Sequence, residues 1–208
     1  MTKGRTETKN NIITAARTLF SFHGYSCTAL EDILNAAGVS KGAFYHHFKS
    51  KEQLCRDIVE KVLQEYKQLA ESADDGAEPV EQLRFWLMRL IERQYSGQWV
   101  NCRFITRLSI ESGQLGPDLQ SLIRSFWQWY EEFYQNLLVR CGLDRQEQAQ
   151  RAARCLISTL FGAMWLEQAV PSNHSLEQLV EDLIKAVLPD SNHQRDTAEK
   201  HYTRCGTM

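Results

Sequence analysis

The chain has 208 residues, of which 43% are hydrophobic and 24% are charged, an ordinary composition for a soluble globular protein. No apolar run approaches the length of a membrane span and no signal peptide opens the chain, so we expect a cytoplasmic protein that binds no membrane. Only four prolines are present and helix-forming residues are plentiful, which favours an all-α fold.

The formal net charge of −2 is unevenly distributed along the chain. Residues 1–53 hold seven Lys and Arg against four Asp and Glu, a balance of +3. Residues 54–208 hold 17 against 22, a balance of −5. Chance can produce such an asymmetry, but the basic segment is the one suited to meet phosphate groups.

The residue types that commonly carry catalysis or bind metals show no catalytic or metal-binding pattern. No Ser/His/Asp order, glycine-rich phosphate loop or pair of carboxylates stands out, so we expect neither an enzyme nor a cofactor. The cysteines form no C-x-x-C pair and no zinc-ligand spacing with histidine, so we expect free thiols and no metal. They are Cys27, Cys55, Cys102, Cys141, Cys155 and Cys205.

The chain begins with a polar stretch and a first helix. We expect residues 1–8 to form a mobile arm that is either disordered or in contact with nucleic acid. Residues 9–23 are expected to be helical, because apolar residues recur there at helical spacing and give one inward stripe. That stripe consists of Ile12, Ile13, Ala16, Leu19 and Phe20.

Two short helices joined by a tight turn are predicted between Thr28 and Lys51. Thr28 and Glu31 have the spacing of a capping box, which predicts the start of the first of these helices. Gly38 is suited to end that helix, because glycine adopts the positive φ that a helix end commonly needs. Ser40 is a good N-cap for the second helix, which spans residues 41–47.

The second of these helices has an unusual surface. Phe44 and Phe48 lie four residues apart and can anchor the helix inward. The remaining side chains are small, basic or hydrogen-bonding, which suits close approach to base edges and phosphates. They are Lys41, Gly42, Ala43, Tyr45, His46 and His47.

This region resembles the DNA-binding signature of the TetR (tetracycline-repressor) family of bacterial transcription regulators. The similarity covers about the first quarter of the chain, and the remainder resembles the family only in length and helical character. The matching residues are Gly24, Tyr25, Thr28, Ile33, Ala36, Ala37, Gly38, Val39, Ser40, Gly42, Phe44, Tyr45, His47, Phe48, Lys51, Glu52 and Leu54.

The resemblance implies which residues touch DNA. It implies phosphate contacts by Thr28, Ser40, Tyr45 and Lys51, and hydroxyls and helix N-termini do bind anions well. Capping alone is the alternative role for the first two. The groove-facing candidates on the second helix are Lys41, Gly42, Ala43 and His46.

The rest of the chain predicts a second, helical domain at residues 51–188, after a DNA-binding head at residues 1–50. Its helices are expected at residues 51–73, 79–96, 102–112, 118–141, 145–168 and 176–188. The first of them leaves the head without an internal glycine or proline, so it is a natural lever between head and domain. Residues 189–208 are polar, and we expect a disordered tail.

Aromatic residues are abundant in the second domain, which holds all five tryptophans. Core packing explains most of them, but indole N–H groups need partners, and an aromatic-walled pocket for a small molecule is the functional alternative. The candidate pocket residues are Trp86, Trp99, Phe104, Trp129, Phe133 and Trp165.

Three polar residues extend this candidate pocket. Arg103 and Arg107 lie four apart on one helix face, where they can meet an anionic ligand or form surface salt bridges. Cys102 opens a predicted helix capped by Asn101, and a helix N-terminus lowers the pKa of a thiol. It is therefore either a sensor of oxidants or electrophiles or an inert, half-buried cysteine.

The last two predicted helices carry apolar stripes wider than an outer helix needs. Two such helices can pair with their symmetry mates in a four-helix bundle, as the family resemblance also implies. We therefore expect a homodimer, and a charge at Leu160 is expected to break it. Closure of the monomer core is the alternative.

These features predict a ligand-responsive transcriptional repressor that a small molecule releases from a palindromic operator in double-stranded DNA. An activator, or a regulator that needs its ligand as co-repressor, is possible on the same fold. A helical enzyme or scaffold with an incidental helix-turn-helix is the alternative of a different class, and the lack of clustered catalytic residues argues against it.

Overall fold

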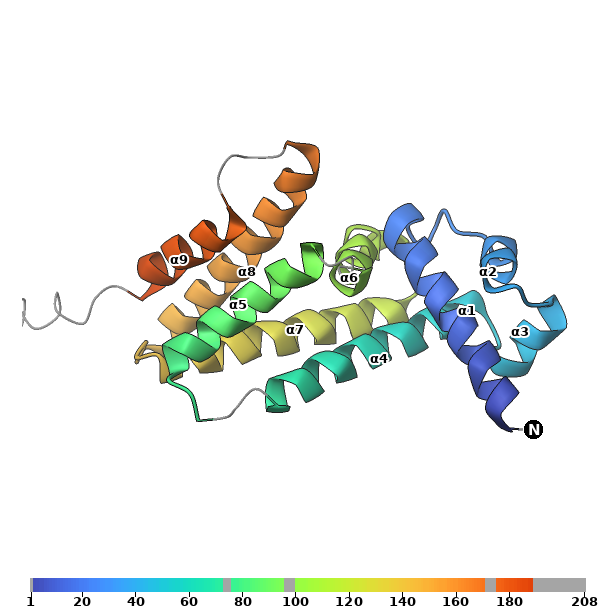
Figure 1. Ribbon diagram of the computed structural model, residues 1–208, viewed down its shortest axis with the longest axis horizontal. Coiled ribbons are helices and arrows are strands. Elements are labelled where there is room, and N and C mark those ends of the chain that lie inside the picture. Colours follow the sequence, from blue (N-terminus) through green and yellow to red (C-terminus); the bar gives the residue numbers. More distant parts are fainter. Residues whose placement is uncertain (1, 73–75, 96–99, 171–174, 189–208) are drawn as a thin grey trace, which may run out of the picture. The chain divides into compact units, whose positions relative to one another are not determined.

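The computed structural model of the protein describes residues 2–72, 76–95, 100–170 and 175–188 (Figure 1). Within these ranges every regular element is a helix, which confirms the all-α prediction. Of the helices described, none combines the length and apolar character that a membrane crossing requires. The elements are α1 (Thr2–His23), α2 (Leu30–Ala37), α3 (Lys41–His47), α4 (Lys51–Ser72), α5 (Pro79–Tyr95), α6 (Val100–Ile110), the 3-10 helix η1 (Ser112–Gln114), α7 (Pro117–Arg140), α8 (Gln146–Ala169) and α9 (Leu176–Val187).

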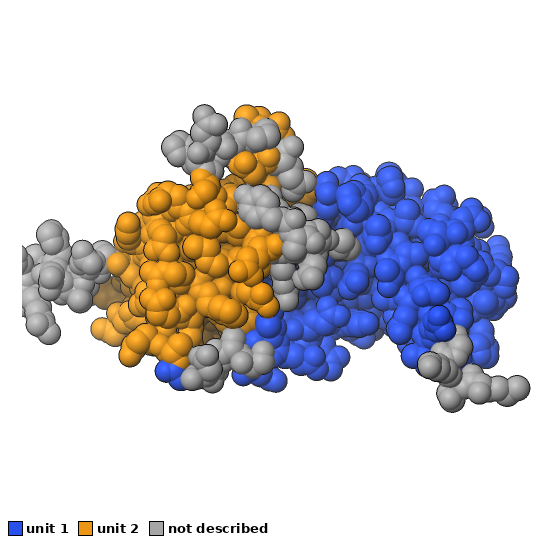
Figure 2. Space-filling view, in the orientation of Figure 1, with its two compact units in different colours: residues 1–76, 93–130 blue, residues 77–92, 131–208 orange. Residues whose placement is uncertain are grey.

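The chain divides into two compact units (Figure 2). Unit 1 comprises Met1–Gly76 and Arg93–Tyr130, and unit 2 comprises Ala77–Glu92 and Glu131–Met208. The predicted boundary between head and second domain, at residues 50 and 51, falls inside unit 1 and remains a prediction about function. The expected tail at residues 189–208 lies outside the described residues.

The N-terminal part of unit 1 packs around α1, which contacts α2, α4 and α6 (Figure 1). Four of the five residues of the predicted stripe of α1 are buried, because the helix turns that face toward its neighbours. The neighbouring helices contribute their own buried side chains to the same core. These are Ile33 and Leu34 of α2, Phe44 of α3, Phe48 after it, and Leu54 and Ile58 of α4.

Tyr66 of α4 joins the remaining helices of unit 1. Its ring meets those of Phe126 and Tyr130 on α7 edge-on, with centroid separations of 5.8 and 5.9 Å. Its hydroxyl lies 2.7 Å from the Sγ atom of Cys102 on α6. Since Tyr66 is itself buried, α4, α6 and the first part of α7 share one core.

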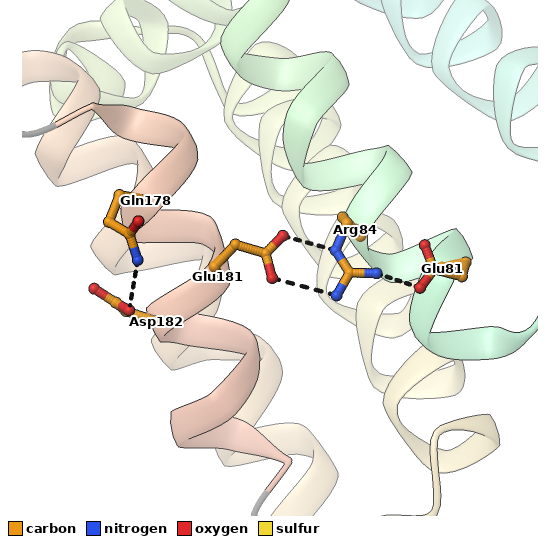
Figure 3. Close-up of polar contacts among 5 residues, drawn as sticks. All are labelled: Glu81, Arg84, Gln178, Glu181 and Asp182. Carbon is orange, nitrogen blue, oxygen red and sulfur yellow. Dashed lines mark hydrogen bonds and ion pairs between the residues drawn. The ribbon is translucent and has the colours of Figure 1, made fainter.

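Unit 2 contains most of α5, the last part of α7, and the helices α8 and α9. Trp86 of α5 packs against Phe133 of α7 with ring centroids 5.1 Å apart. Arg84 of α5 lies between Glu81 and Glu181, and it donates to both carboxylate oxygens of Glu181 on α9 at 2.7 and 3.2 Å (Figure 3). These hydrogen bonds hold the pKa of Glu181 below its usual range and tie α9 to α5.

Two helix starts differ from the prediction. Residues 2–8 of the expected arm are part of α1, which begins at Thr2, because no proline there interrupts a run rich in helix-forming Lys, Arg and Glu. The helix α6 begins at Val100, so Asn101 is not its cap. The Asn101 side chain instead accepts from Arg17 of α1 and donates to Glu65 of α4, both at 3.1 Å.

Candidate nucleic-acid interface

The turn between α2 and α3 has the predicted geometry. Gly38 has a φ of 64°, in the left-handed region, and its N–H donates to the carbonyls of Leu34 and Asn35 at the end of α2. The Oγ atom of Ser40 accepts from the backbone N–H of Ala43 at 3.2 Å and so caps α3. A helix, a glycine turn and a capped second helix form a helix-turn-helix.

The start of α2 differs from the predicted capping box of Thr28 and Glu31. The helix begins at Leu30, and the carboxylate of Asp32 accepts from the backbone N–H of Ala29 at 2.8 Å. The register of the cap is therefore one residue later than predicted. Thr28 is 2% exposed and its hydroxyl donates to the carbonyl of Gly24 at 2.6 Å. Because this hydroxyl is already used inside the fold, we leave Thr28 out of the proposed phosphate contacts.

The short helix α3 has two contrasting faces. Phe44 and Phe48 are buried with their rings 5.6 Å apart, and they hold the helix to the core as predicted. On the other side, residues spaced by four share one face. The exposed residues of that face are Lys41, Gly42, Tyr45 and His46, and Ala43 is half-buried beside them.

Gly42 leaves the middle of this face open. A Cβ atom at Gly42 would meet only the Ser40 Oγ atom, at 3.9 Å, so packing inside the protein does not require a glycine there. Within a helix, glycine is less favourable than alanine by about 1 kcal/mol. The missing side chain does, however, let another molecule approach the backbone of α3 closely.

A basic side chain from α1 lies near the end of α3. The Nζ atom of Lys9 lies 5.5 Å from the centroid of the Phe48 ring and 3.9 Å from a carboxylate oxygen of Asp57. The pKa of His47 lies below its ordinary value, first because partial burial disfavours the charged ring, and further because His46, Arg5 and Lys9 are close. The position of Lys9 could not be predicted from the sequence, because it depends on how α1 packs against α4.

Lys51 makes contacts inside the protein, and the phosphate contact that the resemblance implies for it stays a prediction. Its Nζ atom donates to the backbone carbonyls of Tyr25 and Thr28 at 2.9 and 2.8 Å, and lies 4.3 Å from the centroid of the Tyr25 ring. Loss of hydration lowers the pKa of Lys51. The side chain therefore clamps the turn between α1 and α2, and an ammonium with three protons retains one for another acceptor.

The predicted pocket residues are distributed over both units. Cys102, Arg103, Phe104, Arg107 and Trp129 belong to unit 1, whereas Trp86, Phe133 and Trp165 belong to unit 2. Trp99 lies outside the described residues. The structure brings Trp86 and Phe133 into contact within unit 2, and the assignment of the whole set to one pocket stays a prediction.

The polar members of the predicted pocket have partners inside unit 1. Cys102 is buried against the hydroxyl of Tyr66, and it is the third residue of α6 rather than its first. The guanidinium of Arg103 stacks over the ring of Phe22 at 4.6 Å. Arg107 pairs with Glu111 at 3.4 Å, so the salt-bridge alternative describes this arginine. The five cysteines described by the structure are free, as expected.

Comparisons with known proteins agree with this architecture. Residues 12–58 match the protein family described as "Bacterial regulatory proteins, tetR family". The HTH-type transcriptional repressor DhaR of Mycobacterium sp. (strain GP1) is 28% identical over 195 residues, which cover 91% of this chain and 96% of that protein.

Two solved structures share the fold. A TetR transcriptional regulator from Chloroflexus aurantiacus J-10-FL is 26% identical with a TM-score of 0.76, covering 90% of this chain and 98% of that one. AibR, solved in complex with isovaleryl coenzyme A and operator DNA, is 20% identical with a TM-score of 0.67, covering 88% of this chain and 98% of its own.

Proposed function

We propose that this chain, a DNA-binding transcriptional repressor of the TetR family of bacterial regulatory proteins, is released as a homodimer from a palindromic operator by a small molecule. The observation that carries the proposal is the outer face of α3. There Lys41, Tyr45 and His46 stand exposed around Gly42, on a capped helix whose other side is buried. Such a repressor acts in the cytoplasm, where the bacterial chromosome lies.

In the proposed complex, α3 enters the major groove of the operator. Its N-terminus, capped by Ser40, faces a phosphate, because the free N–H groups of a helix start attract anions. The hydroxyl of Tyr45 donates a hydrogen bond to a second phosphate, and Lys41 and His46 face base edges. Gly42 and Ala43 let the backbone approach the groove.

The proposed dimer forms through α8 and α9 of unit 2. One exposed face of α8 carries mostly small side chains at spacings of three and four, which allow two helices to approach closely. It consists of Cys155, Ser158, Thr159, Gly162 and Leu166. On α9, the residues left half-buried beside the core are Leu179, Leu183 and Val187.

Leu160 is not part of this face. It is 0% exposed within a single chain, so a charge at Leu160 would disrupt the core of unit 2 instead of testing the dimer. The apolar stripe of α8 on which the sequence prediction rested faces the core of unit 2 and does not include the exposed face of this helix. Burial separates the residues that close the core from those proposed to meet a partner.

The proposed effector binds among the aromatic residues of unit 2. Trp86 and Phe133 offer an apolar surface in unit 2, and the indole N–H of Trp165 is buried without an acceptor among the described residues. A buried N–H without a partner is rare in proteins and suits a ligand that carries an acceptor. The fold can hold both kinds of partner, since AibR was solved with an acyl coenzyme A and operator DNA.

A lever from the effector to the head is expected in α4 and α6. α4 meets α6 through Glu65, which accepts from Asn101, and through Tyr66, which contacts Cys102. Asn101 also accepts from Arg17 of α1, so one side chain connects α1, α4 and α6. The two heads of a dimer must keep a separation of about 34–36 Å to read successive major grooves, so small tilts of α4 can abolish operator binding.

A selection from random DNA duplexes tests this function. The purified protein should enrich a palindrome whose half-site centres lie about one helical turn apart, with an affinity that falls steeply as salt rises. Compounds that raise the melting temperature of the protein are then tested for release of that operator. Enrichment of no sequence would refute operator binding, and stabilising compounds that never weaken operator binding would refute the effector.

Replacing Tyr45 by Phe should lower affinity for every duplex by about tenfold, because a hydrogen bond to a charged phosphate is lost while the ring still packs on Phe44. The hydroxyl is neutral, so the slope of affinity against salt should not change. Fluorescence anisotropy with the selected operator and a random duplex measures both quantities. A change in sequence preference would assign Tyr45 to base recognition instead.

Operator affinity should rise as the pH falls through the histidine range. In the free protein the pKa of His47 is depressed, so the ring is neutral near pH 7. A nearby phosphate favours the charged ring, so binding takes up a proton. We expect a gain of about threefold to tenfold between about pH 8 and about pH 6. His47→Gln should flatten this slope, and an unchanged slope would place His47 away from the DNA.

A further inference from the structure

The turn from Gly24 to Thr28, between α1 and α2, is held from two sides. Lys51 at the start of α4 donates to the carbonyls of Tyr25 and Thr28. Glu111, directly after α6, accepts from the backbone N–H of Ser26 through its Oε2 atom at 2.9 Å. One donor of the turn is thus bound from the end of α6, and two acceptors are bound from the start of α4.

The carboxylate of Glu111 is placed with little freedom. Its side chain is 11% exposed and its Oε1 atom lies 3.4 Å from the Nε atom of Arg107, one helical turn earlier. Gly24 has a φ of 89°, and a Cβ atom there would overlap the Oε1 atom of Glu111. A side chain at this position would therefore strain the left-handed backbone and displace the carboxylate of Glu111.

The turn leads directly into the helix-turn-helix. α2 begins at Leu30, and the Gly38 turn then fixes the start of α3 relative to α2. A displacement of the turn therefore changes the direction in which α3 leaves the core. The contact between Glu111 and Ser26 joins residues 85 apart in the sequence, and it connects α6 to this turn without passing through α4.

We infer that Glu111 is a positioning residue for operator recognition, which orients α3 by holding the backbone N–H of Ser26. This inference rests on the proposed function, because it requires two heads that read half-sites at a fixed separation. Random DNA imposes no such separation, so nonspecific binding tolerates a loose turn. Movement of α6 that withdraws the carboxylate lowers operator affinity and leaves the electrostatic attraction to DNA intact.

Three variants of the full-length chain test the inference on an operator selected by the wild-type protein and on a random duplex of equal length. Glu111→Ala should lower operator affinity by about tenfold, the worth of one charge-assisted hydrogen bond, and change random-duplex affinity by less than about twofold. Glu111→Gln should recover operator affinity to within about threefold of wild type, because its amide oxygen can still accept from Ser26. Asp118→Ala removes an acid that pairs with Arg56 of α4 at 3.1 Å, away from the turn, and should change neither affinity.

Each outcome has one meaning. Wild-type protein that selects no operator refutes the proposed function. If the wild-type protein selects an operator and the Glu111→Ala variant binds that operator as tightly as wild type, the positioning role is refuted. Equal losses on both duplexes with a lower melting temperature would make Glu111 a residue that only stabilises the fold, and Gln as poor as Ala would exclude the hydrogen bond to Ser26.

Discussion

Lys51→Met should abolish operator binding and lower the melting temperature of the protein. Methionine has a similar length but no donor, so the carbonyls of Tyr25 and Thr28 lose the ammonium that they share. Leaving partly buried acceptors unsatisfied costs about 1–3 kcal/mol each. For a chain of this size, each kcal/mol lowers the melting temperature by about 2–4 °C, so a total fall of about 4–24 °C is expected.

Lys49→Met is the matched control for this variant. Lys49 is an exposed lysine two residues earlier, so its replacement removes the same charge from the same region without touching the turn. It should weaken binding to all DNA a few-fold and leave the melting temperature unchanged. If Lys51→Met behaved in this way too, Lys51 would be a phosphate contact, as the resemblance to the TetR family implies, and its clamp on the turn would be unimportant.

The helix-turn-helix could be predicted from the sequence almost residue by residue, because local interactions define it. Gly38 needs only its own backbone conformation to end α2, and Ser40 caps α3 with a hydrogen bond to a residue three positions later. Ser175 caps α9 through the same local interaction, since its Oγ atom accepts from the backbone N–H of Gln178, three positions later. The remaining helices were placed within one or two residues by their apolar periodicity, except that α1 begins earlier and η1 was not foreseen.

The roles of polar side chains could not be predicted, because their partners are distant in sequence. Asn101 looked like a cap, but it bonds to Arg17, 84 residues earlier. The phosphate contacts implied for Thr28 and Lys51 stay predictions, and the hydrogen bonds that each makes to carbonyls of the turn between α1 and α2 had no signal in the sequence. Glu111 showed no sequence signal at all, since its partner is a backbone N–H and the room for its carboxylate comes from Gly24.

Gly162→Glu should convert the proposed dimer into a folded monomer that binds operator about a hundredfold more weakly, because the second head no longer adds to the first. The substitution is compatible with the fold of a single chain. Nothing lies within 4 Å of a Cβ atom at Gly162, and glutamate is a better helix former than glycine. In the dimer, by contrast, two carboxylates would be buried on the face where α8 meets its symmetry mate. Sedimentation and anisotropy measure the two effects.

Gln150→Glu provides the comparison on the same helix. It adds the same charge at another exposed position of α8, about a third of a turn around the helix from Gly162, and should leave both the dimer and operator affinity unchanged. Circular dichroism must show that Gly162→Glu keeps the helical content of the wild type, since a misfolded monomer would say nothing about the interface. A folded Gly162→Glu protein that sediments as a dimer would place the contact between chains outside this face of α8. The α3 helices of the two heads would then have to reach successive grooves through a different arrangement of the subunits.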